Sequence, residues 1–260
     1  MPSSSPGFVT AWMSHGSING PEAMTAILFL AISAARPVTF SREQLVTSDM
    51  IIANEPQESV RDLCQVLAVD APEKVVMLEK NTPSRRVRRT YEEFWRHVAS
   101  EASDIVLYDT DCFETLIPWL ESMSSSPIRA LRVSASLAAY RLVDWFIKVG
   151  TQLRKQLSSI QRQLNTEKRR SGISQRNDST RVAKKRAAQG KGKKKELSPK
   201  GKELANKVDK LTTKNSQLTE LSDRVYRSTF IGRYRDIHAD VRSMSLSALG
   251  GWIMMFPDQF

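Results

Sequence analysis

The side chains with the clearest chemical potential are the lysines and arginines between residues 148 and 202. This stretch holds eighteen Lys or Arg residues against three acids, and the whole chain carries a net charge of +11. The rest of the chain is therefore slightly acidic. Positive charge concentrated in one segment attracts a polyanion locally. Nucleic acid is the polyanion that this pattern favours.

The densest part of this segment contains two basic groups separated by a short spacer: Lys184, Lys185 and Arg186, then Lys191, Lys193, Lys194 and Lys195. The arrangement is similar to a bipartite nuclear localisation signal, and it would also contact DNA or RNA in a salt-sensitive way without reading bases. No aromatic residue interleaves the groups, so base stacking on single strands is not expected to dominate. A solvated linker that its own charge keeps extended is the alternative.

Ser198 opens the sequence Ser-Pro-Lys-Gly-Lys, a pattern that proline-directed kinases favour. A phosphate there would partly neutralise the neighbouring basic segment. Ser198 is therefore a possible phosphorylation site, although Ser-Pro pairs are also common in linkers.

The sequence lacks the spacings that catalysis or metal binding needs. His15, His97 and His238 lie in unrelated segments, without a Cys, Ser or second His placed to build a nucleophile or a metal site. Cys64 and Cys112 have no CxxC partner and are interpreted as reduced core thiols. We expect no catalytic residue, no metal site and no cofactor, and hence no enzyme.

The elements that position these residues are helices, since strand and hairpin signals are nearly absent. We predict an all-α protein with short helices over 6–15, 21–34, 58–69, 85–103 and 111–123. The aromatic stripe of Tyr91, Phe94, Trp95 and Val98 is typical of a helix core face. The apolar run 23–35 is too short for a membrane span and follows no basic residue, so it predicts a buried helix and no membrane partner.

Two longer apolar stripes follow, over 128–164 and 204–225, with three- and four-residue spacing. The first predicts one helix of about 55 Å, whose distal half should protrude. The second places Asn215 at a seam position that can fix register. We expect an antiparallel helical hairpin, joined by a basic loop over about 169–198 that is too polar to order itself.

The last residues carry a specific pattern: Arg233-Tyr234-Arg235-Asp236, then Val241-Arg242, Leu249-Gly250 and Trp252. It resembles the opening of the stromalin conservative domain, which belongs to the stromal antigen subunit family of cohesin. The upstream stretches Ile128-Arg-Ala-Leu-Arg and Ser136-Leu-Ala-Ala-Tyr-Arg-Leu are similar to the long helix of that family. Ile237 and His238 depart from its pattern after Asp236.

The resemblance implies a HEAT-repeat-like helical solenoid with helical repeats over 6–127, the long hairpin over 128–229 and an incomplete stromalin conservative domain over 230–260. It also implies a non-catalytic cohesin subunit that binds kleisin and DNA or chromatin, meets other cohesin subunits through kleisin, and supports sister chromatid cohesion and chromosome segregation. The implied location is the nucleus, on chromosomes. Arg233, Arg235 and Arg242 are possible DNA contacts, unless they only pair locally with Asp236 and Asp240.

Family members continue beyond the position of Phe260, so the chain is interpreted as a fragment, a truncated gene model or a short paralogue. The surface that recruits regulators in the family would lie past this position. Residues 252–256, Trp-Ile-Met-Met-Phe, make a poor polar cap, and an exposed apolar end is predicted. The alternative function is a basic coiled-coil arm that binds RNA or ribosomes non-specifically.

Overall fold

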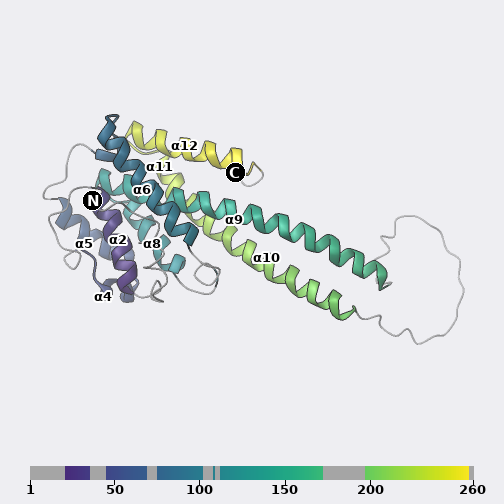
Figure 1. Ribbon diagram of the computed structural model, residues 1–260. Helices are drawn as coiled ribbons and strands as arrows, with labels where there is room; N and C mark the ends of the chain where they lie inside the picture. Colours follow the sequence, from purple (N-terminus) through teal and green to yellow (C-terminus); the bar gives the residue numbers. More distant parts are fainter. Residues whose placement is uncertain are drawn as a thin grey trace, which may run out of the picture. The chain divides into compact units, whose positions relative to one another are not determined.

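The computed structural model describes residues 21–35, 45–68, 75–101, 108, 112–171 and 197–257, and Figure 1 labels their helices. The α-helices are α2 (Pro21–Ala35), α4 (Ser48–Ala53), α5 (Pro56–Ala68), α6 (Thr82–Glu101), α8 (Cys112–Ser124), α9 (Arg129–Arg170), α10 (Pro199–Val225), α11 (Ile231–Arg233) and α12 (Ala239–Met255). A 3₁₀ turn, η1 (Val76–Leu78), and a π-helix, η2 (Tyr226–Phe230), complete the set. No strand occurs among these residues, which confirms the predicted all-α class.

The predicted helices over 21–34, 58–69, 85–103 and 111–123 correspond to α2, α5, α6 and α8. The predicted helix over 6–15 lies outside the described residues. Helix α4 was not predicted, because its six residues are too few to show a helical period. This helix is set by its ends instead: the Thr47 hydroxyl accepts a hydrogen bond from the Met50 N–H at 3.4 Å, and Asn54 ends the helix in the left-handed conformation.

The chain forms two compact units, one made of residues 1–149 and 218–260 and the other of residues 150–217. Helices α9 and α10 each contribute one part to each unit. The predicted boundaries at 127/128 and 229/230 follow a different criterion, the family resemblance, and they stay predictions.

The first half of α9 is the centre of the first unit, since every side chain from Ala130 to Tyr140 is buried. Helix α6 packs Tyr91, Trp95 and Val98 inward, which confirms the predicted core stripe. The Tyr91 hydroxyl donates to the Ser134 carbonyl at 3.0 Å and so joins α6 to α9. A helix buried on all sides tolerates few polar groups. In α9 the Ser134 hydroxyl donates to the Leu131 carbonyl at 3.1 Å, and Arg132 donates to Asp236 at 3.0 Å.

The apolar run near the start of the chain forms α2, whose Ile27, Leu28 and Ile32 are buried. The predicted buried helix is therefore confirmed. Within the described parts of the chain, no helix combines the length and the hydropathy that a membrane crossing requires. Cys64 and Cys112 are free and buried, as predicted, and burial raises the pKa of the Cys112 thiol to about 11.

The predicted exposed apolar end is right for three of its five residues and wrong for Trp252, while Phe256 is half-buried. Ile253, Met254 and Met255 are exposed, with Met254 at 88%. Trp252 is fully buried instead: its indole N–H donates to Asp144 Oδ1 at 2.8 Å, and its ring meets Tyr140 edge-on at 5.4 Å. The tryptophan points inward because it shares the inner face of α12 with Val241, Ser245 and Ala248.

In the second unit the end of α9 and the start of α10 run side by side in opposite directions (Figure 1). Leu164 and Leu204 are buried between them, as the two apolar stripes predict. This is the antiparallel helical pair that we expected. Residues 172–196 of the predicted basic loop lie outside the described residues.

Candidate nucleic-acid interface

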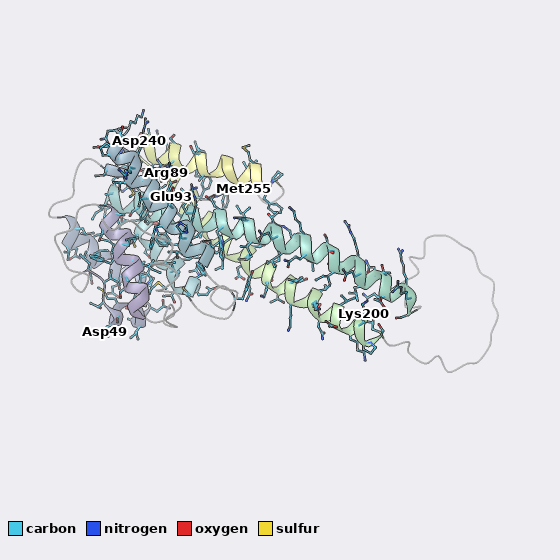
Figure 2. All side chains as sticks on the ribbon, viewed as in Figure 1. Asp49, Arg89, Glu93, Lys200, Asp240 and Met255 are labelled. Carbon is cyan, nitrogen blue, oxygen red and sulfur yellow. The ribbon has the colours of Figure 1, made fainter. Side chains whose placement is uncertain are left out.

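The antiparallel pair of the second unit is held by an apolar seam with a polar contact at each end. Near one end, Asn215 Oδ1 of α10 lies close to Gly150 of α9: a Cβ added to this glycine would be 3.7 Å from that oxygen. The predicted seam asparagine therefore faces α9. At the other end, Glu167 Oε1 accepts from Arg170 at 3.1 Å. The same oxygen lies 4.0 Å from the ammonium of Lys200, which Figure 2 labels on the ribbon of α10. Several basic side chains of the pair, Lys155, Arg162 and Arg169 among them, are exposed.

The described residues of this pair, 150–171 and 197–217, hold eleven Lys or Arg side chains and three acids. Glu167 and Glu203 are engaged by Arg170 and Lys207, the latter at 2.6 Å. The hydrogen bond and charge of Lys207 lower the pKa of Glu203, which stays ionised at neutral pH. A net charge of about +8 on two adjacent helices produces a positive electrostatic potential, which concentrates anions along the helices.

Three cations follow one line on α9: Lys155, Arg162 and Arg169 recur every seven residues and are exposed. Seven residues are almost two turns, so these side chains share one face, spaced about 10 Å apart. They stand opposite the apolar seam of Leu157 and Leu164. The described part of the chain offers none of the three an ion-pair partner.

The predicted contact residues Lys184, Lys185, Arg186, Lys191, Lys193, Lys194 and Lys195 lie outside the described residues. Their role stays a prediction. The described cations of the helical pair were missed as contact residues, although they fall inside the basic stretch. The signal that identifies them is the seven-residue spacing of charge opposite an apolar stripe.

Ser198, the possible phosphorylation site, is the residue before α10. Its hydroxyl oxygen accepts a hydrogen bond from the Gly201 N–H at 3.0 Å, the geometry of a helix N-cap. The side chain is half-buried. Phosphorylation would add negative charge at the positive end of the helix dipole, beside Lys200 and Lys202.

The arginines of the Arg233-Tyr-Arg-Asp motif lie in the first unit, around Asp236. This carboxylate is buried and accepts from Arg132 of α9 at 3.0 Å, from Arg233 at 2.6 Å and from the His238 backbone N–H at 3.0 Å. Burial alone would raise the pKa of Asp236, but the His238 N–H and the two guanidinium groups lower it below its ordinary value. The cluster ties the motif to the start of α9.

The three predicted DNA-contact arginines have separate surroundings. Arg233 is engaged by Asp236, as its alternative interpretation proposed. Arg242 donates to the backbone carbonyls of Asp236 at 2.7 Å and Ile237 at 3.0 Å, and so caps the turn rather than pairing with a carboxylate. Arg235 is exposed and stacks on the Tyr234 ring, with its guanidinium carbon 4.9 Å from the ring centre. Of the three, Arg235 is the best placed to reach a partner.

Asp240 pairs with Arg129 at 3.0 Å and with none of the three predicted arginines. Within the described ranges, no three or more His, Cys, Asp or Glu side chains gather in a way that could hold a metal ion.

Comparison with known proteins gives a consistent group of matches. A family model, the STAG domain, matches residues 74–188. Sister-chromatid cohesion protein 3 of Arabidopsis thaliana is 29% identical over 170 residues, which is 64% of this chain and 13% of that protein. Cohesin subunit SA-3 of Homo sapiens is 25% identical over 216 residues, or 83% of this chain and 16% of that protein.

A solved structure, cohesin subunit Scc3 from Z. rouxii (residues 88–1035), has the same fold, with a TM-score of 0.73 and 18% identity. The likeness covers 98% of this chain and 27% of that one. It confirms the predicted HEAT-repeat-like helical solenoid. The chain spans less than a fifth of the length of the curated relatives named above.

Proposed function

We propose that the chain is a member of the stromal antigen (stromalin) family and acts as a non-catalytic cohesin subunit that binds kleisin and chromatin. In this role it supports sister chromatid cohesion and chromosome segregation, and it reaches the other cohesin subunits through kleisin. Its place is in the nucleus, on chromosomes. The match of residues 74–188 to the STAG domain carries this proposal.

The second observation behind chromatin binding is the charge of the antiparallel helical pair. Lys155, Arg162 and Arg169 form an exposed line of cations that two helices hold in place. Phosphate contacts of this kind position a protein on a duplex without reading its sequence. We propose that this line acts together with the basic groups of residues 184–195, and that Arg235 adds a weaker contact.

DNA binding is tested with the purified chain and a labelled 30-base-pair duplex over a series of salt concentrations. We expect the double variant Lys155→Glu, Arg162→Glu to bind more weakly, with the slope of log K against log salt smaller by about 0.9 for each phosphate that is no longer neutralised. The matched control reverses Arg85 and Arg86, two exposed arginines of α6. If both variants bind DNA equally weakly, the helical pair is not the interface.

Kleisin binding is tested by a pull-down of the cohesin kleisin subunit with a chain that lacks residues 172–196, at moderate salt. The scaffold proposal predicts that kleisin is retained, because the helical body makes the contact. The alternative, a basic arm that binds RNA or ribosomes, predicts that this deletion abolishes all binding. Failure of a folded, fully helical variant to retain kleisin would contradict the scaffold proposal.

A further inference from the structure

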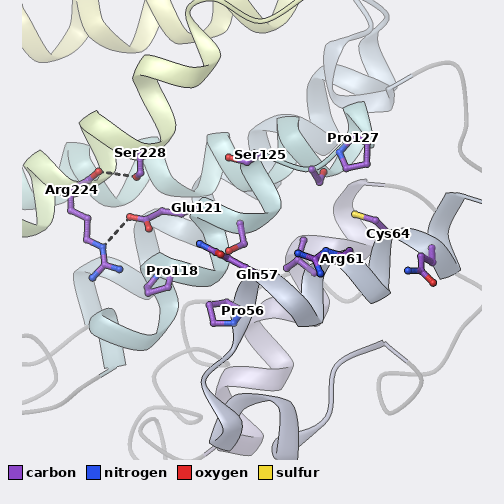
Figure 3. Close-up of a pocket in the computed structure, with 14 residues that line it drawn as sticks. Pro56, Gln57, Arg61, Cys64, Pro118, Glu121, Ser125, Pro127, Arg224 and Ser228 are labelled. Carbon is purple, nitrogen blue, oxygen red and sulfur yellow. Dashed lines mark hydrogen bonds and ion pairs between the residues drawn. The ribbon is translucent and has the colours of Figure 1, made fainter.

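An open pocket of about 730 Å³ lies in the first unit, between α5, α8 and the segment where α10 passes into η2 (Figure 3). Its volume falls within the range of about 300–1,000 Å³ that is usual for ligand sites. None of the predicted site residues lines it, and it is a different surface from the basic helical pair. Helices α5 and α8, which form two of its walls, pack directly against each other.

The pocket combines an apolar floor with a polar rim. Val60 and Cys64 of α5 are buried beneath it, and Pro118 of α8 forms part of one wall. Gln57 and Gln65 stand exposed along the same face of α5, and their amides make no hydrogen bond within the described part of the chain. A side-chain amide offers both a donor and an acceptor, so it can pair with the N–H and C=O of an extended peptide.

The two arginines of the pocket differ in their partners. Arg224 donates to Glu121 at 3.1 Å (Figure 3). It also donates to Glu114 at 3.4 Å, and these two carboxylates compensate its charge. Arg61 is exposed in the opposite wall and forms no ion pair with any described residue. The pocket therefore has one uncompensated cation beside an apolar floor. A planar guanidinium is well suited to bind a carboxylate through two hydrogen bonds.

We propose that this pocket docks an extended peptide segment of a partner protein, with one Asp or Glu side chain held by Arg61. The apolar floor accepts small aliphatic side chains next to the acid, and Gln57 and Gln65 hold the peptide backbone. A peptide fits better than nucleic acid, since phosphates would meet the carboxylate of Glu121 on the other wall. The partner is thus recognised by a single carboxylate in an apolar context.

The probe is a phage-displayed library of random nine-residue peptides, selected on the immobilised full chain. We expect the selected peptides to share one acidic position flanked by aliphatic residues. A synthetic copy of the strongest sequence should bind the Arg61→Glu variant about tenfold or more weakly, because a charge-assisted hydrogen bond becomes a repulsion. Selection on Arg61→Glu itself should replace the acid with Lys or Arg.

Two further variants locate the contact. Ser125→Trp places a large ring on an exposed lining residue and should block the peptide without removing any side-chain hydrogen bond. Arg85→Glu makes the same charge change on α6 and should leave peptide affinity unchanged. Duplex DNA binding should be the same for all three variants, so that this test is separate from that of the helical pair. Selected peptides without a shared acid, or equal binding to Arg61→Glu, would overturn the proposal.

Discussion

At the scale of single residues, Asp236 has the most demanding surroundings. It lies 104 positions from Arg132 in the sequence, yet the two form a buried ion pair whose side chains are 2% and 7% exposed. Arg132 also donates to the carbonyls of Ser126 and Pro127, so the guanidinium has partners on two sides. A buried charge that is fully paired is stable, whereas one that loses its partner is costly.

We therefore expect Asp236→Asn to lower the free energy of unfolding by about 3–5 kcal/mol, since Arg132 is left buried without its counter-charge. Urea unfolding followed by circular dichroism measures the change. The matched control is Asp240→Asn, which breaks the ion pair of an exposed carboxylate with Arg129 and should cost no more than about 1 kcal/mol. Equal effects of the two variants would show that the Asp236 cluster is not a structural centre.

The same cluster predicts a pH dependence. The pKa of Asp236 is lower in the folded chain than its ordinary value of 3.8, so the unfolded chain takes up a proton first as the pH falls. Its contribution to stability is complete above about pH 4 to 5 and declines as the pH drops below 3.8. The stability difference between the wild-type chain and Asp236→Asn should shrink between about pH 5 and pH 3. A constant difference over this range would contradict the lowered pKa.

At the scale of elements, helix ends and glycines decide local stability. Ser198 caps α10 through the Gly201 N–H, so Ser198→Ala should cost about 1 kcal/mol and reduce hydrogen-exchange protection in the first turn. Ser198→Asp keeps an acceptor at the cap and should retain that protection. If Ser198→Ala exchanges like the wild type, the cap does not stabilise the helix.

Phosphorylation of Ser198 would act on this same helix end. Mass spectrometry of the chain isolated from mitotic cells is the direct test, and we expect a phosphate on Ser198. The Ser198→Asp variant should also bind duplex DNA more weakly than Ser198→Ala, because it adds negative charge beside Lys200 and Lys202. An unmodified Ser198 in mitotic protein would contradict the prediction.

Helix α12 contains two adjacent glycines, Gly250 and Gly251, and a Cβ at either position would meet no atom within 4 Å. Glycine in a helix interior is less favourable than alanine by about 0.5–1 kcal/mol. Gly251→Ala should therefore raise the midpoint of thermal unfolding by a few degrees. A lower midpoint would mean that another surface approaches α12 at this position.

At the scale of the whole molecule, the sequence predicted most of the helices and both stripes of the antiparallel pair, because local periodicity encodes which face of a helix is buried. It also located the excess of positive charge. It did not predict which described cations form a line, since that depends on their position relative to the seam of the pair. Lys155, Arg162 and Arg169 belong to the predicted basic stretch, but only the structure shows that they form one exposed line on α9.

The pocket beside Arg61 could not be predicted from the sequence, because its walls come from distant parts of the chain. Its walls come from α5, α8 and the α10–η2 segment, in which Arg224 lies 103 residues after its partner Glu121 of α8. No spacing rule links Gln57 to Arg224. Arg61 is the candidate anion-binding residue of the pocket only because the other arginine, Arg224, is neutralised by Glu114 and Glu121.

The sequence by itself determined the all-α class, the core stripe of α6, the long helical pair and the resemblance to the stromal antigen family, because each rests on neighbours within a few turns or on a contiguous motif. Only the tertiary structure decided that Trp252 turns inward onto Asp144 and that Arg233 and Arg132 converge on Asp236. It also decided that Arg61 forms no ion pair with any described residue while it lines the pocket. The physical reason is the distance along the chain over which the interactions act. A helical period is set by local backbone geometry, whereas ion pairs and pockets join side chains that only packing brings together.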